Sequence, residues 1–584
     1  MKIGLSSSEL KKRTSKDYLS TKIMLKKDAP EYTNLADGDK AALKHLVKAA
    51  VILEEVYLKM DDARNIPFRD YLKAEIKKSN ADAKLAMKLF KAQKGINAVD
   101  MNADKFSLLR GAKELPGKGL YPADLTKEEF HAILKTMLAE GKKEEVAKIL
   151  NQRSVIVRDG KALKALDYTE AFKKEFRLAA RHILQAAETS TNKDFNEFLQ
   201  LQAKALTVCD PMADAYADKK WASLQDTPLE FTITRENYED EMTETVYENE
   251  ELSALLKKNG IEAVSKDMLG FRVGIVNKEG TDKLLEIKKY LPELAKNMPY
   301  ADKYKQNITV AGAAQDKGDA GGSGSDDIKQ NMVDVDIVTV KGDVGAYRAG
   351  ITLAENLPNY DKLSIKIGGG RRNVYHRQIR AVSDRKWLQK LLDATLDKNL
   401  HQFFENEANH WFTIGHENGH SLGPNSGTEV LGKYKSIIEE NKADMISMAM
   451  IDKLVELGMY TELQKKQIIT IFAVDCVLKA KPNLSQAHRV RTVMQLYHFL
   501  KTGAFTIKNG VITINYEKVV PAAAEMLKKI IEVQISGSFE KGEQYVLENF
   551  IWSDEIEKLA AKMRKVNKTL NGTVKEELAN WLAR

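Results

Sequence analysis

The spacing of apolar residues changes twice along the chain, from a helical pattern to an alternating pattern and back. In residues 39–60, apolar side chains recur every three or four positions, as on one face of a helix. Residues 229–234, 271–276 and 335–340 alternate apolar and polar side chains, as strands do. Helical spacing returns at residue 384 and dominates the rest of the chain. This order predicts an α+β protein that is mostly helical.

These changes of pattern divide the chain into three regions. We expect a mostly helical region over residues 1–206, a strand-rich region over residues 207–370 and a helical region over residues 371–584. Residues 312–327, inside the second region, contain too few apolar side chains to pack, which predicts a mobile surface loop.

Shorter segments give local predictions. Residues 350–353 and 363–367 have the pattern of a further pair of strands. Arg371, Arg372 and Arg377 are expected to lie on a solvated face, and binding of substrate carboxylates is the less favoured alternative. Thr126, followed by two glutamates, predicts a helix start, and Asn509-Gly510 predicts the two-residue turn of a hairpin.

The composition excludes several functional classes. Lysine and arginine exceed aspartate and glutamate by only 91 − 83 = 8 among 584 residues, with no basic block, which argues against a nucleic-acid partner. The two cysteines, Cys209 and Cys476, are too few for a disulfide framework or a cysteine-based metal site. No uncharged apolar run reaches the roughly 18 residues of a membrane span. No signal peptide is visible, so we expect a cytoplasmic protein. Two alternatives stay open: the protein is exported and its signal has been removed, or the amino terminus of this chain is not the native one. The sequence does not predict the oligomeric state.

The motif that most constrains function is His416-Glu417-Asn418-Gly419-His420. Residues four apart share one helix face, so both imidazoles can bind one ion with Glu417 beside it. The pattern arises by chance in about 1 in 100 chains of this composition. The alternative is an ordinary helix with core or surface histidines. The motif predicts His416 and His420 as metal ligands and Glu417 as a general base.

A second segment supplies a third ligand. Residues 436–454 have helical spacing, and Glu440 and Asp444 fall on the same stripe as Ile437 and Ile451. Carboxylates on a buried stripe are costly unless a cation or hydrogen-bond donors meet them. A surface helix with an acidic patch would instead place them opposite that stripe. We therefore predict Glu440 as the third ligand and Asp444 as the acceptor of the outer N–H of a ligand histidine.

Two histidines and one glutamate are the ligand set of catalytic zinc, which keeps one position for water. We expect one Zn²⁺ per chain. Zinc lowers the pKa of its water towards about 7, so that Glu417 can take the proton and pass it to the leaving amine. Glu439 points about 100° away from Glu440 on the helix. It is either solvated or in contact with a metal-ligating side chain, without binding the ion itself.

With these motifs, the sequence resembles the dipeptidyl peptidase III family of zinc metallopeptidases, especially its shorter bacterial and plant branch. That family follows its histidine motif with Glu-Glu-x-x-Ala-acid, whose second glutamate binds zinc, and Glu439-Glu440-Asn-Lys-Ala-Asp444 matches it. Animal and fungal members carry one extra residue between the glutamate and the second histidine. The resemblance covers roughly residues 205–505. It implies two lobes around a wide cleft, a helical lobe that carries the zinc and a lobe with a β core.

The resemblance also implies substrate-binding residues. Asn356 and Asn359 match two asparagines that hold the amino-terminal backbone of the substrate, although asparagines in a Pro-Asn turn are an alternative. Glu236 matches the residue that pairs with the free α-ammonium, and Tyr238 the one that hydrogen-bonds the developing oxyanion. His488 matches a histidine that assists the substrate carbonyl, although a core histidine is the commoner case.

Together, the motifs and the resemblance predict an exopeptidase that releases amino-terminal dipeptides from short oligopeptides by Glu-assisted attack of a zinc-bound water. An endopeptidase or an aminopeptidase with another cleavage register would use the same metal site. A non-catalytic peptide-binding protein is the alternative from another class. Some relatives carry an additional nucleotide-diphosphate hydrolase module, but the sequence has no matching glycine–glutamate box.

Overall fold

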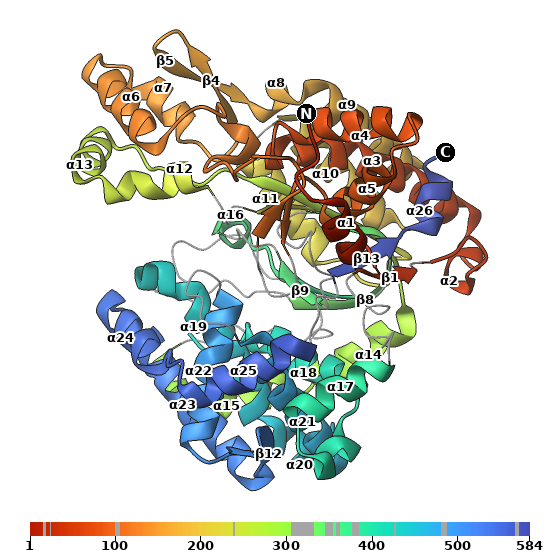
Figure 1. Cartoon of the computed structure of the whole chain (residues 1–584), viewed down its shortest axis with the longest axis vertical. Coiled ribbons are helices and arrows are strands. Elements are labelled where there is room, and N and C mark those ends of the chain that lie inside the picture. The colour runs from red at the N-terminus through yellow and green to blue at the C-terminus, as the bar shows by residue number, and fades with distance from the viewer. Residues whose placement is uncertain are drawn as a thin grey trace, which may run out of the picture.

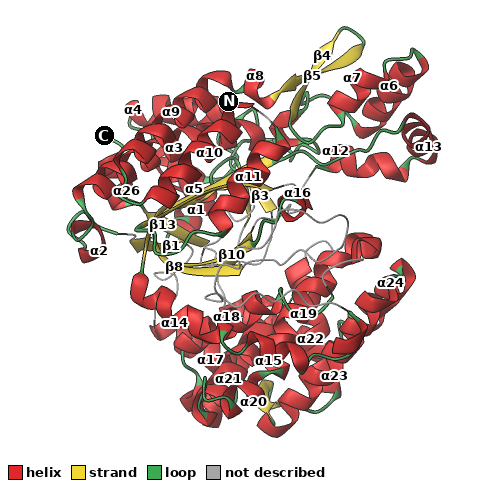
Figure 2. Ribbon diagram, turned by 180° about the vertical axis from the view of Figure 1, so that it is seen from behind, coloured by secondary structure: helices red, strands yellow, loops and turns green. Residues whose placement is uncertain are grey.

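The computed structural model describes the chain except residues 16–18, 24, 100–104, 209, 237–239, 305–331, 345–353, 358–361, 377–384, 425–427, 481–486 and 567–570. The described residues form two lobes, an upper and a lower one in Figures 1 and 2. Helices predominate in both lobes, and the largest sheet belongs to the upper lobe. The predicted mostly helical α+β class, with one helical lobe and one lobe that has a β core, is confirmed.

The upper lobe packs helices against this sheet. Its central helix, α3 (Asp37–Asp61), buries an apolar stripe that includes Leu43, Val47 and Leu53, which explains the helical spacing in the sequence. The other helices are α1 (Ser7–Arg13), α2 (Pro30–Thr33), α4 (Asn65–Lys77), α5 (Ala81–Gln93), α6 (Lys127–Ala139), α7 (Lys143–Ile149), α8 (Tyr168–Ala171), α9 (Lys173–Thr189), α10 (Lys193–Val208), α11 (Pro211–Ala222), α12 (Glu241–Glu244), α13 (Glu250–Asn259), α16 (Lys362–Lys366) and α26 (Glu577–Leu582). Thr126 caps α6 through the backbone N–H of Glu129, as its sequence predicts.

The main sheet has five strands in the order β6-β7-β8-β10-β9. The pairs β6–β7, β7–β8 and β10–β9 are antiparallel, whereas β8–β10 is parallel. The strands are β6 (Leu229–Glu236), β7 (Met268–Val276), β8 (Met332–Val344), β9 (Ala354–Leu357) and β10 (Arg371–His376). Three further pairs flank it: β1 (Leu19–Ile23) with β13 (Asn571–Lys575), β2 (Asn97–Val99) with β3 (Lys105–Ser107), and β4 (Ser154–Asp159) with β5 (Ala162–Asp167).

A buried ion pair shows that the main sheet curls. Arg372 Nη2 on β10 lies 3.0 Å from Glu230 Oε2 on β6, and each side chain is 1% exposed. Two strands separate β6 from β10, so the two backbones would lie about 14 Å apart in a flat sheet. The prediction of a solvated face is therefore wrong for Arg372. The Arg372 guanidinium can be buried because the Glu230 carboxylate neutralises its charge.

The predicted strand at residues 363–367 is also wrong, because the structure forms helix α16 there. Short alternating runs do not distinguish a strand from a short helix, and the neighbouring contacts decide. Here Lys219 on α11 donates a hydrogen bond to the carbonyl oxygen of Ile367, and α16 packs against α11. The predicted loop at 312–327 and the partner strand at 350–353 lie outside the described residues.

The lower lobe has its own hydrophobic core of helices. They are α15 (Leu291–Lys296), α17 (Arg385–Thr395), α18 (Glu407–Gly419), α19 (Lys435–Ala449), α20 (Ile451–Glu456), α21 (Glu462–Lys479), α22 (Ala487–Lys501), α23 (Tyr516–Ser536), α24 (Phe539–Asn549) and α25 (Asp554–Val566). The hairpin of β11 (Phe505–Lys508) and β12 (Val511–Ile514) is confirmed. Asn509 and Gly510 both have positive φ, which matches the tight turn that this dipeptide favours.

Each lobe takes residues from distant parts of the sequence. Leu291 and Leu294 belong to the lower core, although they precede strands β8, β9 and β10 of the upper sheet. Leu578 and Leu582 of α26 belong to the upper core, although they follow the whole lower lobe. Helix α14 (Lys278–Lys288) links the two lobes, because its buried Leu284 and Ile287 pack with Tyr375 of β10 and Ile414 of α18. Along the described chain, every helix is too short or too polar to cross a bilayer.

Candidate metal centre

Helices α18 and α19 lie close together at the centre of the candidate site, and two glycines make this possible. A Cβ atom on Gly415 would overlap Ser447 Oγ and lie 2.9 Å from Ser447 Cβ. A Cβ atom on Gly419 would lie 3.0 Å from the carbonyl oxygen of Ala443. Ser447 Oγ also donates a 2.9 Å hydrogen bond to the carbonyl oxygen of Phe412, which joins the two helices. Residues of α18 can therefore share one site with residues of α19.

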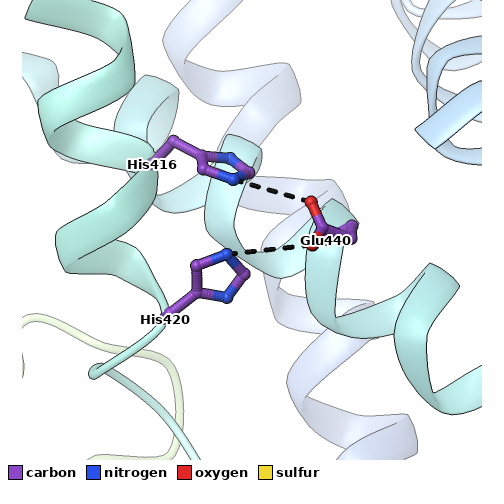
Figure 3. Close-up of side chains that lie close together, drawn as sticks. All are labelled: His416, His420 and Glu440. Carbon is purple, nitrogen blue, oxygen red and sulfur yellow. Dashed lines mark ion pairs between the residues drawn. The ribbon is translucent and has the colours of Figure 1, made fainter. Parts of the chain in front are cut away.

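His416, His420 and Glu440 converge between these helices, as Figure 3 shows. One potential ligand atom from each residue lies within 4.8 Å of those from the other two. His416 Nε2 is 3.5 Å from Glu440 Oε2, and His420 Nε2 is 3.9 Å from Glu440 Oε1. His420 keeps helical dihedral angles at the carboxyl end of α18, so the spacing of four residues still places both imidazoles on one face.

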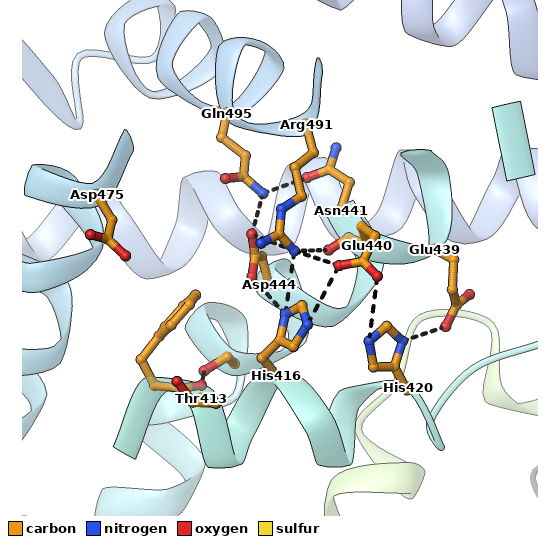
Figure 4. A network of polar contacts seen from close by, with 12 residues as sticks. Thr413, His416, His420, Glu439, Glu440, Asn441, Asp444, Asp475, Arg491 and Gln495 are labelled. Atoms are coloured by element: carbon orange, nitrogen blue, oxygen red, sulfur yellow. Dashed lines mark hydrogen bonds and ion pairs between the residues drawn. The ribbon is translucent and has the colours of Figure 1, made fainter. Parts of the chain in front are cut away.

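Each histidine has a carboxylate behind it (Figure 4). His416 Nδ1 lies 2.7 Å from Asp444 Oδ1, and His420 Nδ1 lies 3.1 Å from Glu439 Oε1. A carboxylate accepts the Nδ1–H, so each neutral imidazole keeps its Nε2 lone pair for the side that faces Glu440. Two lone pairs and a carboxylate directed at one point favour a cation there.

The Asp444 carboxylate is stabilised in its charged form. Arg491 Nη1 lies 3.2 Å from Asp444 Oδ2, and Gln495 Nε2 donates to the same oxygen at 2.9 Å. Burial alone would raise the pKa of Asp444, but Arg491 and His416 outweigh it and lower this pKa to about 2. Gln495 Nε2 also donates to Asn441 Oδ1 at 2.9 Å, which fixes the amide.

The Glu439 carboxylate has equivalent support on the other side of the site. Lys442 Nζ lies 2.9 Å from Glu439 Oε1, and Gln534 Nε2 of α23 donates to Glu439 Oε2 at 3.0 Å. Burial opposes ionisation, but Lys442 and His420 lower the pKa of Glu439 to about 2. Both carboxylates behind the histidines are therefore charged over the whole physiological range.

The donor set fits a zinc ion. Imidazole nitrogens and a carboxylate oxygen are ordinary zinc ligands, and two histidines with one glutamate occur at catalytic zinc sites. The outer N–H groups of both imidazoles already have carboxylate acceptors, which is the usual arrangement behind ligand histidines. The residues present therefore meet the needs of the ion that the sequence predicts.

Glu417 follows His416 on α18 and is 6% exposed. Burial lowers the pKa of His416, whereas Asp444 and, to a smaller extent, Glu417 raise it, and the net shift is upward. Glu417 is thus a buried carboxylate within the stretch of α18 that carries His416 and His420. This position suits a general base beside a metal ligand.

The predicted substrate-binding residues belong to both lobes. Glu236 ends the edge strand β6, and Asn356 lies in the other edge strand, β9, opposite Asn373 of β10. His488 lies near the start of α22 in the lower lobe, and α22 packs against α19. Tyr238 and Asn359 lie outside the described residues.

Sequence reasoning missed Arg491, which lies on α22 beside the candidate ligands. Its Nη1 donates to Glu440 Oε2 at 2.8 Å and to the carbonyl oxygen of Glu440 at 3.1 Å. A single guanidinium thus holds the third candidate ligand and contacts Asp444. A signal was present, because Arg491 follows His488 by three residues and so shares its side of the helix.

Two solved structures have the same architecture. The structure of DPP III from Caldithrix abyssi superposes with a TM-score of 0.77 and 23% identity, over 97% of this chain and 99% of that chain. Dipeptidyl-peptidase III from Corallococcus sp. strain EGB gives a TM-score of 0.76 and 19% identity, over 99% of both chains. The chain has the dipeptidyl peptidase III fold. The two lobes implied by the resemblance in sequence are thus found in structures of that name.

A curated relative is also similar over most of this chain. Nudix hydrolase 3 of Arabidopsis thaliana is 22% identical over an alignment of 562 residues that covers 86% of this chain. The chain spans 66% of the length of that relative, slightly less than two thirds. No family model matches the sequence. The likeness to dipeptidyl peptidase III structures therefore concerns the fold.

Proposed function

We propose that this chain is a zinc-dependent exopeptidase that releases amino-terminal dipeptides from short oligopeptides. The observation that carries the proposal is the convergence of His416, His420 and Glu440, with a carboxylate behind each histidine. This arrangement occurs in a chain with the fold of dipeptidyl peptidase III structures. His416, His420 and Glu440 would hold one Zn²⁺, with Asp444 and Glu439 orienting the imidazoles.

Bound zinc would polarise the scissile carbonyl and make the attacking water more acidic. Glu417 takes the proton of the attacking water and later gives it to the leaving amine. Tyr238 donates a hydrogen bond to the oxyanion that develops on the scissile carbonyl, and His488 assists that carbonyl. The roles of Tyr238 and His488 come from the resemblance in sequence.

The remaining residues place the peptide. Glu236 pairs with the free α-ammonium, and Asn356 and Asn359 bind the amino-terminal backbone. The distance from the residue that binds the ammonium to the metal ligands then sets how many residues are released from the peptide. Lobe closure would exclude water from the bound peptide and strengthen these polar contacts.

Metal analysis combined with product analysis tests the proposal. We expect one zinc per chain, loss of activity on chelation, and dipeptides as the first products from peptides of three to eight residues. Acetylation of the amino terminus removes the charge that Glu236 would bind, so acetylated peptides should be cleaved much more slowly. Single residues as first products, or equal cleavage of acetylated peptides, would contradict the exopeptidase register. If the protein binds one zinc per chain and binds peptides but hydrolyses none of them, the proposed enzymatic function is contradicted.

A further inference from the structure

A polar cavity lies in the upper lobe between strand β6, helix α11 and helix α16. Its volume is about 40 Å³, which has room for roughly three water-sized groups. In both ribbon views, α11 and α16 lie on the side of the upper lobe that faces the lower lobe. The lining residues that matter here are Arg153, Asp214, Asp218, Arg235, Asp267 and Leu363.

The fixed charges around this cavity balance. Arg153 forms an ion pair with Asp214, and its Nε donates to Asp267 Oδ2 at 3.0 Å. Arg235 Nη2 lies 3.8 Å from Asp214 Oδ1. Two guanidinium groups therefore face the carboxylates of Asp214 and Asp267, with no charge left over.

Two groups at the cavity have unused hydrogen-bonding capacity. The Arg235 side chain is 10% exposed, and within the described part of the chain its buried Nε and Nη1 have no hydrogen-bond acceptor. Asp218 lines the same cavity and makes no hydrogen bond or ion pair with any other residue that the structure describes. The two buried nitrogens of Arg235 need an acceptor, because leaving them unpaired is costly.

The electrostatics of Asp218 favour a neutral partner. Burial and the nearby Asp214 carboxylate raise the pKa of Asp218 well above its usual range, which favours the neutral form of this acid. A charged ligand group would then upset the balance between the two arginines and the two carboxylates. A neutral group is needed that offers an acceptor to Arg235 and a donor to Asp218. A carboxamide has both, on a planar group of three heavy atoms.

We propose that this cavity is a specificity pocket for a neutral carboxamide side chain, that of asparagine or glutamine, in the amino-terminal dipeptide of the substrate. The carbonyl oxygen of the ligand accepts from Arg235, and its NH₂ group donates to Asp218. Arg235 directly precedes Glu236, the residue that would bind the α-ammonium, so the cavity and that residue share the same end of strand β6. The assignment to a substrate side chain rests on the proposed peptidase function.

Isosteric peptides test the pocket. Peptides of equal length carry asparagine, aspartate, leucine or lysine at the first or the second position. The first three have nearly the same shape, so their comparison isolates the hydrogen bonds and the charge. We expect the asparagine peptide to have a kcat/KM about tenfold or more above the other three at one of the two positions. Calorimetry with the zinc-loaded Glu417→Gln variant should give the same order of affinity without turnover.

Variants assign the preference to the two residues. Asp218→Leu and Arg235→Met should each abolish the advantage of asparagine over leucine. Asp218→Asn keeps a neutral group of the same shape with a donor and an acceptor, so it should retain the preference and shows that the fold is intact. Asp194→Leu, on the exposed part of α10, is the matched control and should behave as wild type.

Three outcomes would overturn the pocket: equal kcat/KM and affinity for asparagine and leucine peptides at both positions, a preference for lysine or aspartate, or an unchanged asparagine preference in Asp218→Leu and Arg235→Met. Failure of the wild type to hydrolyse any peptide would instead contradict the peptidase function. In that case, the calorimetric order of the four peptides alone decides for or against the pocket.

Discussion

Asp444 on α19 accepts the Nδ1–H of His416 on α18 across 2.7 Å, so a carboxylate of one helix orients an imidazole of the other. We expect Asp444→Asn to weaken zinc binding by about 10- to 100-fold, because the amide no longer favours the required tautomer. Competition with a chromogenic chelator measures the affinity. Asp475→Asn on α21 is the matched control, since Asp475 pairs with Lys479, and should bind zinc as wild type does. Equal affinities for all three proteins would contradict the role of Asp444.

The lowered pKa of Asp444 predicts a dependence of stability on pH in the metal-free protein. The pKa of about 2 lies below the ordinary value of 3.8, so ionised Asp444 stabilises the fold above pH 4 and loses this effect as the pH falls towards 2. The free energy of unfolding of wild type should therefore fall by about 2 kcal/mol more than that of Asp444→Asn over this range. Denaturant titrations from pH 5 to pH 2 measure the difference. Parallel curves for the two proteins would exclude the shift.

Glu417 and Glu440 should separate turnover from metal binding. Glu417→Gln is expected to keep zinc and lose about 10²- to 10⁴-fold in kcat, the usual contribution of a general base. Glu440→Gln is expected to lose zinc, because the charged ligand between the two histidines is gone. Zinc content by mass spectrometry and kcat on a tripeptide give both readouts. Equal zinc content and equal activity in the two variants would refute the assigned roles.

Gly415 sets the distance between the two helices of the site. In an ordinary helix, glycine to alanine is stabilising by about 0.5–1 kcal/mol. Here the new methyl group would overlap Ser447, so we expect Gly415→Ala to push α18 away from α19 and weaken zinc binding. Gly415→Ala combined with Ser447→Gly should recover part of the affinity, because the space is restored. A Gly415→Ala protein with unchanged zinc affinity and raised stability would show that the helices are not in close contact.

The buried pair of Glu230 and Arg372 predicts a strongly non-additive result. Arg372→Met leaves the Glu230 carboxylate buried without its cation and should cost about 3–5 kcal/mol of stability. Replacing both residues by methionine removes the unpaired charge and should cost much less than the two single changes together. Urea unfolding of the four proteins gives this double-mutant cycle. Additive losses would mean that the two side chains do not interact.

The convergence of the three candidate ligands could be predicted from sequence because its signals are local. The spacing of His416 and His420 and the position of Glu440 on an apolar helix stripe each depend on one helix. The same stripe placed Asp444, whose contact with His416 agrees with the prediction. The sequence does not decide whether Glu439 is solvated or contacts a ligand histidine. Only the packing of α19 against α18 places Glu439 next to His420.

Other features depend on contacts between segments far apart in sequence. Arg372 has the appearance of a surface arginine until the curl of the sheet brings Glu230 to it. The helix at residues 362–366 depends on α11, which lies about 140 residues earlier. Arg491 needed the packing of α22 against α19 before its contact with Glu440 could be seen. Residue patterns within one element do not contain these relationships.

The return of the chain to the upper lobe constrains the order of folding. Strand β13 pairs with β1 in parallel, and α26 adds Leu578 and Leu582 to the upper core. During synthesis, the upper core therefore lacks β13 and α26 until every residue of the lower lobe has left the ribosome. The lower lobe has all its own core residues by Met563 and can close first, so the portion made earlier is completed later.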